Sequence, residues 1–353
     1  MEEKRALLSI IIPIYNGRKN IDRLFESIIK STICRYNTKY NGIELNDIEI
    51  IITDDYSSDK TVSHIKRSKY SKKLNIKYTK PDKKLKRCPG NNRQAGLSIA
   101  SGEWVTFIDQ DDIFVEGGLF DIFVLIQKKE IKYYLCGSFA RENTLGYLSL
   151  IEGITADTWL HGKFYNMDNF IKPFKIEFKK DLISHEDLYF NSCCAVATRH
   201  IINYEQKRYD NPVYIWKQNE ESFSNSKFKN GYYIDEFMEE YIKAGTEPYL
   251  EDLLTFPYYK EDYFAHCCSI LLHAYFYYQS NRTKYGDQCR YENLQYIHEL
   301  KKKITESFGY NSIDIINFVY GDPIGYNEVK KECCIGTDPF VELVSFRDFI
   351  LNN

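Results

Sequence analysis

Short β-branched runs that end at polar residues, separated by segments with helical spacing, constrain the fold of the first half of the chain most strongly. Residues 8–12 and 48–53 are short runs rich in isoleucine, as expected for parallel strands buried on both faces. Residues 76–78 form a weaker run and residues 104–108 a clear one, and apolar residues recur at helical spacing from residue 20 to 29. Repeated β-α-β units predict an α/β fold whose mostly parallel sheet carries helices on both faces.

Acidic residues directly follow two of these predicted strands. The second strand is followed by Asp54 and Asp55, and the fourth by Asp109, Asp111 and Asp112. Ligands bind outside the carboxyl ends of the strands in such sheets. Closely spaced carboxylates also repel one another, which favours a hard divalent cation. The pattern predicts a ligand and metal site at this edge, although each cluster alone also fits a turn or a helix N-cap.

The alternation of strands and helices stops near residue 200. Residues 234–244 and 263–278 have helical patterns rich in aromatic side chains. We therefore predict an α/β domain over residues 1–200 and a mostly helical C-terminal domain over residues 201–353, which contributes acceptor or subunit contacts.

Composition excludes several classes of protein. The formal net charge is −3, which gives no overall attraction to nucleic acid or anionic membranes. The apolar run at residues 7–14 is too short for a signal peptide, and no run is long enough for a transmembrane segment, so we expect a cytoplasmic protein. The ten cysteines include no C-x-x-C pair, which favours buried reduced thiols over a zinc site.

Five short motifs occur in order along the first 200 residues. They are SIIIPIYN (9–16), DDYSSDKT (54–61), PGNNRQAG (89–96), SGEWVTFIDQDD (101–112) and HEDLYFN (185–191). Together they resemble the family 2 glycosyltransferases of the GT-A fold. The resemblance implies a Rossmann-like GT-A domain, a nucleotide-sugar donor that is UDP-linked, and Mn²⁺ or Mg²⁺ as cofactor.

The resemblance also assigns donor-binding roles to single positions. Pro13, Tyr15 and Asn16 correspond to the loop that lines the nucleotide base, and Asp55 to the residue that recognises uracil. Arg93 stands where the family places an arginine near the donor. The residues on either side of Arg93 depart from the family pattern, which leaves the donor sugar open.

The metal and the catalytic base are assigned in the same way. Asp109 and Asp111 correspond to the D-x-D acids, with Asp111 as the direct metal ligand. Asp187 corresponds to the base that takes the proton of the acceptor hydroxyl in a single inverting displacement, and Glu186 to a residue that positions the acceptor or tunes its neighbour. An alternative for both is a pair of acids in the first turn of a helix capped by Ser184.

The segment 158–165 supplies further candidates. The resemblance places it near the donor or acceptor, where Lys163 could meet a phosphate and Trp159 or His161 could stack on a sugar. His185, beside the acidic pair, is a further acceptor candidate. Core packing of Trp159 and ordinary hydrogen bonding of His161 remain open alternatives.

Residues 66–87 hold eleven Lys or Arg and one acid, Asp82. Such a run is typical of a solvated face. Because it leads into the loop at Pro89, it could instead meet an anionic acceptor such as a phosphorylated lipid or polymer, or a nucleic acid.

The expected function is metal-dependent, inverting transfer of a sugar to a hydroxyl of a glycan or polysaccharide. One alternative is a glycosyltransferase acting on a modified nucleic-acid base, as in viral DNA modification. Another is a non-catalytic scaffold that binds a sugar nucleotide, against which the intact acids at Asp55, Asp109, Asp111 and Asp187 argue.

Overall fold

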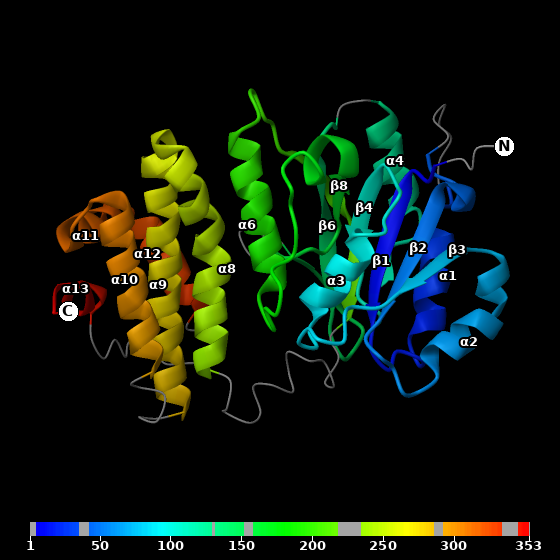
Figure 1. Ribbon diagram of the computed structural model, residues 1–353, viewed down its shortest axis with the longest axis horizontal. Helices are drawn as coiled ribbons and strands as arrows, with labels where there is room; N and C mark the ends of the chain where they lie inside the picture. The colour runs from blue at the N-terminus through cyan, green and yellow to red at the C-terminus, as the bar shows by residue number, and fades with distance from the viewer. Residues whose placement is uncertain are drawn as a thin grey trace. The chain divides into compact units, whose positions relative to one another are not determined.

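The chain forms two compact units in the computed structural model, Met1–Glu220 and Glu221–Asn353. Each unit contains its own set of buried hydrophobic residues. Figure 1 shows a sheet with helices in the first unit and helices in the second. The structure describes residues 5–34, 42–128, 131–151, 158–217, 234–285, 292–333 and 345–352.

The first unit is built on one mixed sheet. Its strands are β1 (Leu8–Ile14), β2 (Ile48–Asp54), β3 (Asn75–Thr79), β4 (Trp104–Phe107), β5 (Ile113–Phe114), β6 (Tyr134–Glu142), β7 (Leu148–Ile151), β8 (Lys163–Asn166) and β9 (Lys207–Lys217). Their order is β3-β2-β1-β4-β8-β6-β9-β5, with β7 beside β6. The first four strands are parallel, as predicted, whereas β8 runs antiparallel to both β4 and β6.

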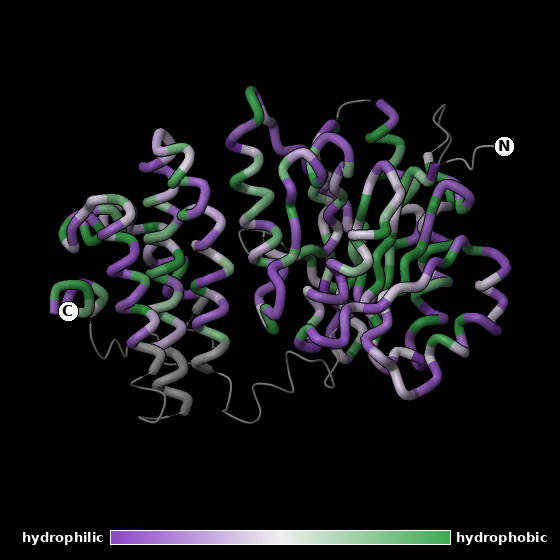
Figure 2. Tube along the Cα trace, viewed as in Figure 1, coloured by the Kyte–Doolittle hydropathy of each residue, from purple (hydrophilic) through white to green (hydrophobic). Residues whose placement is uncertain are grey.

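Helices cover both faces of this sheet. They are α1 (Ile21–Ser31), α2 (Thr61–Arg67), α3 (Pro89–Leu97), α4 (Gly118–Gln127) and α6 (Glu186–Arg199). Alternate residues of β1 divide between two cores, since Ile10 and Ile12 share a cluster with α1 and α4, and Ile11 shares one with α3 and α6. Burial on both faces explains why the sequences of β1 and β2 are rich in isoleucine (Figure 2).

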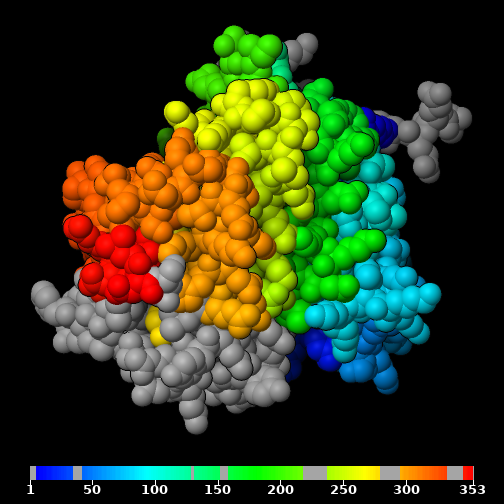
Figure 3. All heavy atoms as spheres, turned by 60° about the vertical axis from the view of Figure 1, so that its left-hand side comes forward, coloured from blue at the N-terminus to red at the C-terminus, as the bar shows by residue number. Residues whose placement is uncertain are grey.

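The second unit consists of helices in its described part, as predicted. They are α8 (Ile234–Thr255), α9 (Lys260–Tyr285), α10 (Glu292–Phe308), α11 (Ser312–Gly321), α12 (Pro323–Cys333) and α13 (Phe346–Leu351). Helix α9 is central: it packs against α8, α10, α11 and α12, and its Tyr275 contacts Phe349 of α13. Figure 3 shows α13, in red, beside the orange helices on one face. No helix among the described residues combines the length and apolar character that a membrane crossing requires.

The described cysteines are free thiols, and most of them are buried. Cys267 and Cys268 lie side by side in α9, and burial raises the pKa of the Cys267 thiol to about 12. The prediction of buried reduced thiols is confirmed for these two residues. Cys34 differs, since it is exposed after the end of α1.

Candidate functional site

A single buried arginine joins three of the sequence motifs. Arg93 in α3 donates to Asp109 Oδ1 after β4 and to Glu186 Oε1 at the start of α6, both at 2.5 Å. The side chain of Arg93 is 8% exposed and that of Glu186 is 11% exposed. Burial lowers the pKa of Arg93, but the two carboxylates outweigh it and raise the pKa overall. The guanidinium therefore stays charged and fixes the positions of both acids.

Helices α3 and α6 approach each other closely at Gly90. A Cβ atom at Gly90 would lie 2.9 Å from Cβ of Glu186, so only glycine fits this position without a shift. Helix α6 begins one residue later than the predicted Ser184 cap, with His185 at the N-cap position and a left-handed φ of 60°. Glu186 and Asp187 therefore occupy the first turn, as predicted.

Asp187 lies next to this ion-pair network. Burial and the neighbouring charge of Glu186 raise its pKa to about 7, against the opposing effect of Arg93. Its Oδ1 accepts a hydrogen bond from the amide of Leu188 at 2.8 Å. Its backbone carbonyl accepts one from Asn191, whose own Oδ1 accepts from Lys163 Nζ at 3.0 Å. Asn191 thus links Lys163 to the candidate base. Lys163 is the first residue of β8, which fixes its position in the sheet.

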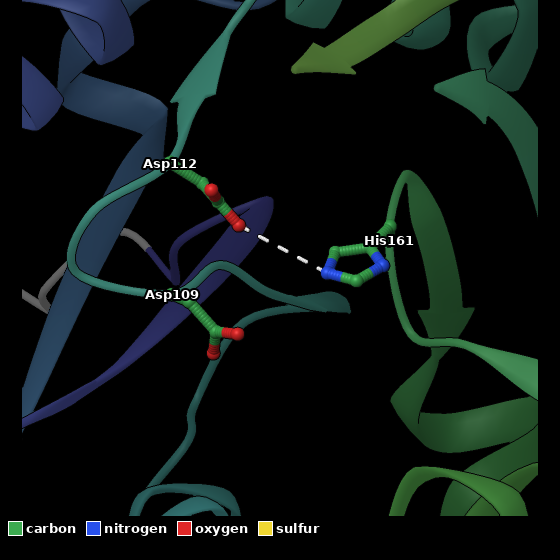
Figure 4. Close-up of side chains that lie close together, drawn as sticks. All are labelled: Asp109, Asp112 and His161. Carbon is green, nitrogen blue, oxygen red and sulfur yellow. Dashed lines mark ion pairs between the residues drawn. The ribbon is translucent and has the colours of Figure 1, made fainter. Parts of the chain in front are cut away.

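The acidic turn after β4 converges with a histidine. Asp109, Asp112 and His161 each offer a ligand atom, and these atoms lie within 4.8 Å of one another. In Figure 4 the three side chains point toward a common space, with His161 Nε2 at 3.9 Å from Asp112 Oδ2. Burial lowers the pKa of His161 to about 4, so its imidazole is neutral near pH 7 and can act as a ligand.

Two of the three acids in the turn accept hydrogen bonds from the protein at their carboxylates: Asp109 from Arg93, and Asp112 from β9. The Tyr214 hydroxyl donates to Asp112 Oδ2, and the Lys217 amide donates to Asp112 Oδ1 at 2.8 Å. Both oxygens of Asp112 are therefore engaged by β9. Asp111 is partly exposed, and its backbone carbonyl accepts from Arg23 of α1 at 2.6 Å.

The predicted base-binding residues form a second group. Asp55 follows β2 and is buried, and its Oδ2 accepts from Arg87 Nε at 3.3 Å. Burial raises the pKa of Asp55, and the charge of Arg87 opposes this shift. The Arg87 guanidinium also lies over the half-exposed ring of Tyr15, 4.4 Å from its centroid. Arg87 thus contacts both Tyr15 and Asp55. From the sequence alone, Arg87 is only part of the basic segment 66–87.

Side-chain hydrogen bonds fix the loops at the ends of β1, β2 and β4. Asn16, which has a left-handed φ of 51°, accepts at Oδ1 from the amide of Ser58 at 2.8 Å. Gln110 exchanges two hydrogen bonds of 3.0 Å with the backbone of Tyr15. Pro13 lies within β1, opposite Thr53. Asn16 therefore has a structural role in this conformation, and Gln110 connects the base-binding group to the acidic turn.

The aromatic candidates pack against β9. Trp159 meets Trp216 at a centroid distance of 5.2 Å, and His161 meets Tyr214 at 4.7 Å. Trp159, His161 and Trp216 are each partly exposed. The strand that carries Trp216 and Tyr214 lies beyond residue 200, and no local motif identified either residue.

Many cations of residues 66–87 have partners within the first unit. Lys77 pairs with the buried Glu49 at 2.6 Å, and Lys80 pairs with Asp54 at 3.0 Å. Lys83 and Lys66 lie over the rings of Tyr56 and Tyr78. Part of the positive charge is thus balanced by acids of β2 rather than presented to a ligand.

The sequence of this chain matches a known protein family. The sequence profile of "Glycosyl transferase family 2" matches residues 9–204, more than half of the chain. The chain belongs to this glycosyltransferase family. The resemblance inferred from the five motifs is thereby confirmed, and the enzyme class with it.

Two curated relatives have related sequences. The "GalNAc(5)-diNAcBac-PP-undecaprenol beta-1,3-glucosyltransferase" of Campylobacter jejuni is 30% identical over 209 residues, which are 57% of this chain and 61% of that protein. The "Poly(ribitol-phosphate) beta-N-acetylglucosaminyltransferase TarS" of Staphylococcus aureus is 33% identical over 104 residues, which are 30% of this chain and 16% of that protein. The matches thus span less than two thirds of either relative.

A solved structure has the same fold. Residues 1–349 of S. aureus TarS in complex with UDP superpose with a TM-score of 0.60 at 19% identity, covering 94% of this chain and 92% of that one. This confirms the predicted GT-A fold with a helical C-terminal region.

Proposed function

We propose that the chain transfers a sugar from a UDP-linked donor to a hydroxyl of a glycan, with inversion at the anomeric carbon and with a divalent cation. The observation that carries the proposal is the Arg93 bridge between Asp109 and Glu186, with Asp187 beside it. This arrangement places Asp187, an acid with a raised pKa, next to two acids that a fixed cation bridges, and that cation lowers the pKa of Asp109. Family 2 membership and the relatives that act on glycans support the same reaction.

Three side chains fit a divalent cation in this site. Asp109 offers a carboxylate oxygen and His161 a neutral imidazole, and their ligand atoms lie within 4.8 Å of each other. We add the partly exposed Asp111 of the same turn as the third ligand, which completes a set that suits Mn²⁺ and, through its oxygens, Mg²⁺. His161 Nδ1 is buried without a hydrogen-bond partner, so its other nitrogen is the one that faces the acids. Asp112 serves instead to orient the turn, because both its oxygens already accept hydrogen bonds. When bound, the cation would neutralise charge on the departing diphosphate.

The protein residues would divide the remaining tasks. Asp55 and Arg87 would hold the nucleotide base, beside the ring of Tyr15. Asp187 would accept the proton of the acceptor hydroxyl at its carboxylate as that oxygen attacks the anomeric carbon. Glu186, held in place by Arg93, would raise the pKa of Asp187 through its neighbouring carboxylate. Lys163 and Asn191 would hold the first turn of α6 in place.

The experiment compares wild type with Asp187→Asn and the surface control Asp210→Asn. Each protein is incubated with a set of UDP-sugars and Mn²⁺, and released UDP is measured with and without candidate glycan acceptors. Loss of a general base should lower turnover by about 10²- to 10⁴-fold in Asp187→Asn. The binding of UDP should persist, and Asp210→Asn should match wild type. Equal turnover of Asp187→Asn and wild type would show that the base lies elsewhere.

A further inference from the structure

An arginine and a tryptophan form a stacked pair outside the residues assigned above. Arg141 lies on β6 directly opposite Trp216 on β9 in the parallel register. The guanidinium carbon is 4.7 Å from the centroid of the Trp216 ring. A guanidinium stacked on an indole keeps its in-plane N–H groups available for other acceptors.

The charge of Arg141 has no counter-ion in the part of the chain that the structure describes. No carboxylate there lies within ion-pair distance of its guanidinium, and its Nε is buried without a hydrogen-bond partner. The adjacent acid, Glu142, is paired with Lys217 at 2.7 Å. The guanidinium therefore lacks a counter-charge, which a ligand oxygen accepting from its terminal N–H groups would supply.

Aromatic side chains connect Arg141 to the candidate metal residues. Trp216 contacts Trp159 at 5.2 Å and stacks with His161 at 6.0 Å, and His161 faces Asp112. The two tryptophans are partly exposed and offer apolar faces against which a sugar or polyol can pack. Pairwise contacts thus connect the cation and the two indoles to the acidic turn.

We propose that Arg141, Trp216 and Trp159 form an acceptor subsite that binds a phosphate group of a phosphate-bearing glycan. Arg141 binds the phosphate through its in-plane N–H groups, and the indoles pack against the adjoining sugar or polyol. A planar guanidinium matches two phosphate oxygens, which a neutral glycan does not supply. The proposal rests on the glycosyltransferase function proposed above and specifies its acceptor class.

Tryptophan fluorescence tests this subsite directly. The chain has three tryptophans, and Trp104 is 1% exposed, so ligand-induced changes report on Trp159 and Trp216. The full chain, saturated with UDP and Mn²⁺ to fill the donor site, is titrated with three probes: an oligomer of ribitol phosphate, an oligogalacturonate and a maltooligosaccharide. We expect the ribitol phosphate oligomer to bind most tightly, with an affinity that falls as salt is added.

Variants separate the phosphate contact from general charge. Arg141→Gln should weaken binding of the ribitol phosphate oligomer by about tenfold or more, and Arg141→Lys by less, because lysine keeps the charge without the planar donors. The matched control is Arg67→Gln, an exposed arginine of α2, which should bind like wild type. Arg141→Gln should also raise the KM for a phosphate-bearing acceptor more than it lowers kcat.

Three results would overturn the subsite. They are equal affinity of the maltooligosaccharide, equal affinity of the oligogalacturonate, and equal affinity of folded Arg141→Gln for the phosphate oligomer. Circular dichroism establishes folding, and Arg141→Lys provides the comparison if the glutamine variant does not fold. Because binding needs no turnover, failure of UDP release in wild type would remove the proposed reaction without removing the phosphate contact.

Discussion

At the scale of single residues, the charge next to Asp187 decides what the site can do. Burial and Glu186 raise the pKa of Asp187, whereas Arg93 lowers it, and the result is about 7. A base with a pKa close to the working pH combines a useful ionised fraction with a strong tendency to take a proton. In the proposed reaction the Arg93 ion pairs would therefore adjust the pKa of the base as well as fix the acids.

The pH dependence of turnover follows from this balance. Asp187 must be ionised to act as a base, so kcat should fall about tenfold per pH unit below about pH 7 and level off above it. Glu186→Gln removes a negative charge that raises the pKa of Asp187, so the acidic limb should move to lower pH. The measurement is kcat from about pH 5 to 9 at saturating donor. A flat wild-type profile below pH 7 would contradict the assignment of Asp187.

Binding of Mn²⁺ distinguishes the two possible sets of acids. Asp111→Asn should weaken Mn²⁺ affinity by about tenfold or more, because a charged ligand is lost. Asp112→Asn should have a smaller effect, since its oxygens are engaged by Tyr214 and Lys217. Electron paramagnetic resonance titration in the presence of UDP measures both affinities. The opposite order would place the ion between Asp109, Asp112 and His161.

At the scale of elements, the amino ends of the parallel strands are joined by a buried carboxylate. Glu49 of β2 accepts from Ser9 of β1, from Ser101 and Gly102 before β4, and from Lys77 of β3. Burial alone would raise its pKa, but Lys77 and the serines lower it to about 2. The candidate site lies at the carboxyl ends of the same strands. Stabilising contacts and candidate functional residues are therefore at opposite ends of the strands.

Glu49→Gln should therefore destabilise the protein in a pH-dependent way. The pKa of Glu49 is lower in the folded state than the ordinary value of 4.5, so its carboxylate stabilises the fold above about pH 4.5. That contribution is lost as the pH falls toward about 2. We expect a loss of about 3 kcal/mol in the free energy of unfolding near pH 7, which shrinks in acid. Urea unfolding measures this, with exposed Glu116→Gln as the control.

At the scale of the whole molecule, the two units have separate hydrophobic cores. All candidate donor, metal and catalytic residues, and the Arg141 subsite, lie in Met1–Glu220. The second unit has its own core around α9, with Cys267, Leu271 and Tyr275 fully buried. The sheet continues past residue 200, because β9 pairs with both β6 and β5.

A chain of residues 1–220 should fold cooperatively and release UDP from its donor with Mn²⁺. Its core and its candidate site need no residue of Glu221–Asn353 within the described contacts that build them. Truncation at residue 200 should instead fail to fold, since it removes β9 and with it the Tyr214 contact to Asp112. Thermal unfolding and UDP release compare the two lengths. Equal behaviour of both would contradict the structural role of β9.

Local sequence patterns specify the parallel half of the sheet and the edge at which the candidate site lies. Strands that are buried on both faces are rich in apolar residues, and ligands bind outside their carboxyl ends, where polar residues follow. Both features can therefore be recognised in short stretches of sequence. The motifs around Asp55, Arg93, Asp109 and Asp187 indicate that edge from the sequence alone.

Which of these side chains meet depends on how the chain folds in three dimensions. The pairing of Arg93 with Glu186, the engagement of Asp112 by Tyr214 and the stacking of Arg141 on Trp216 join residues far apart in the chain. Such contacts depend on strand order and register. Local periodicity determines whether a residue is buried but not which residue lies opposite it, because strands from distant segments become neighbours only on folding.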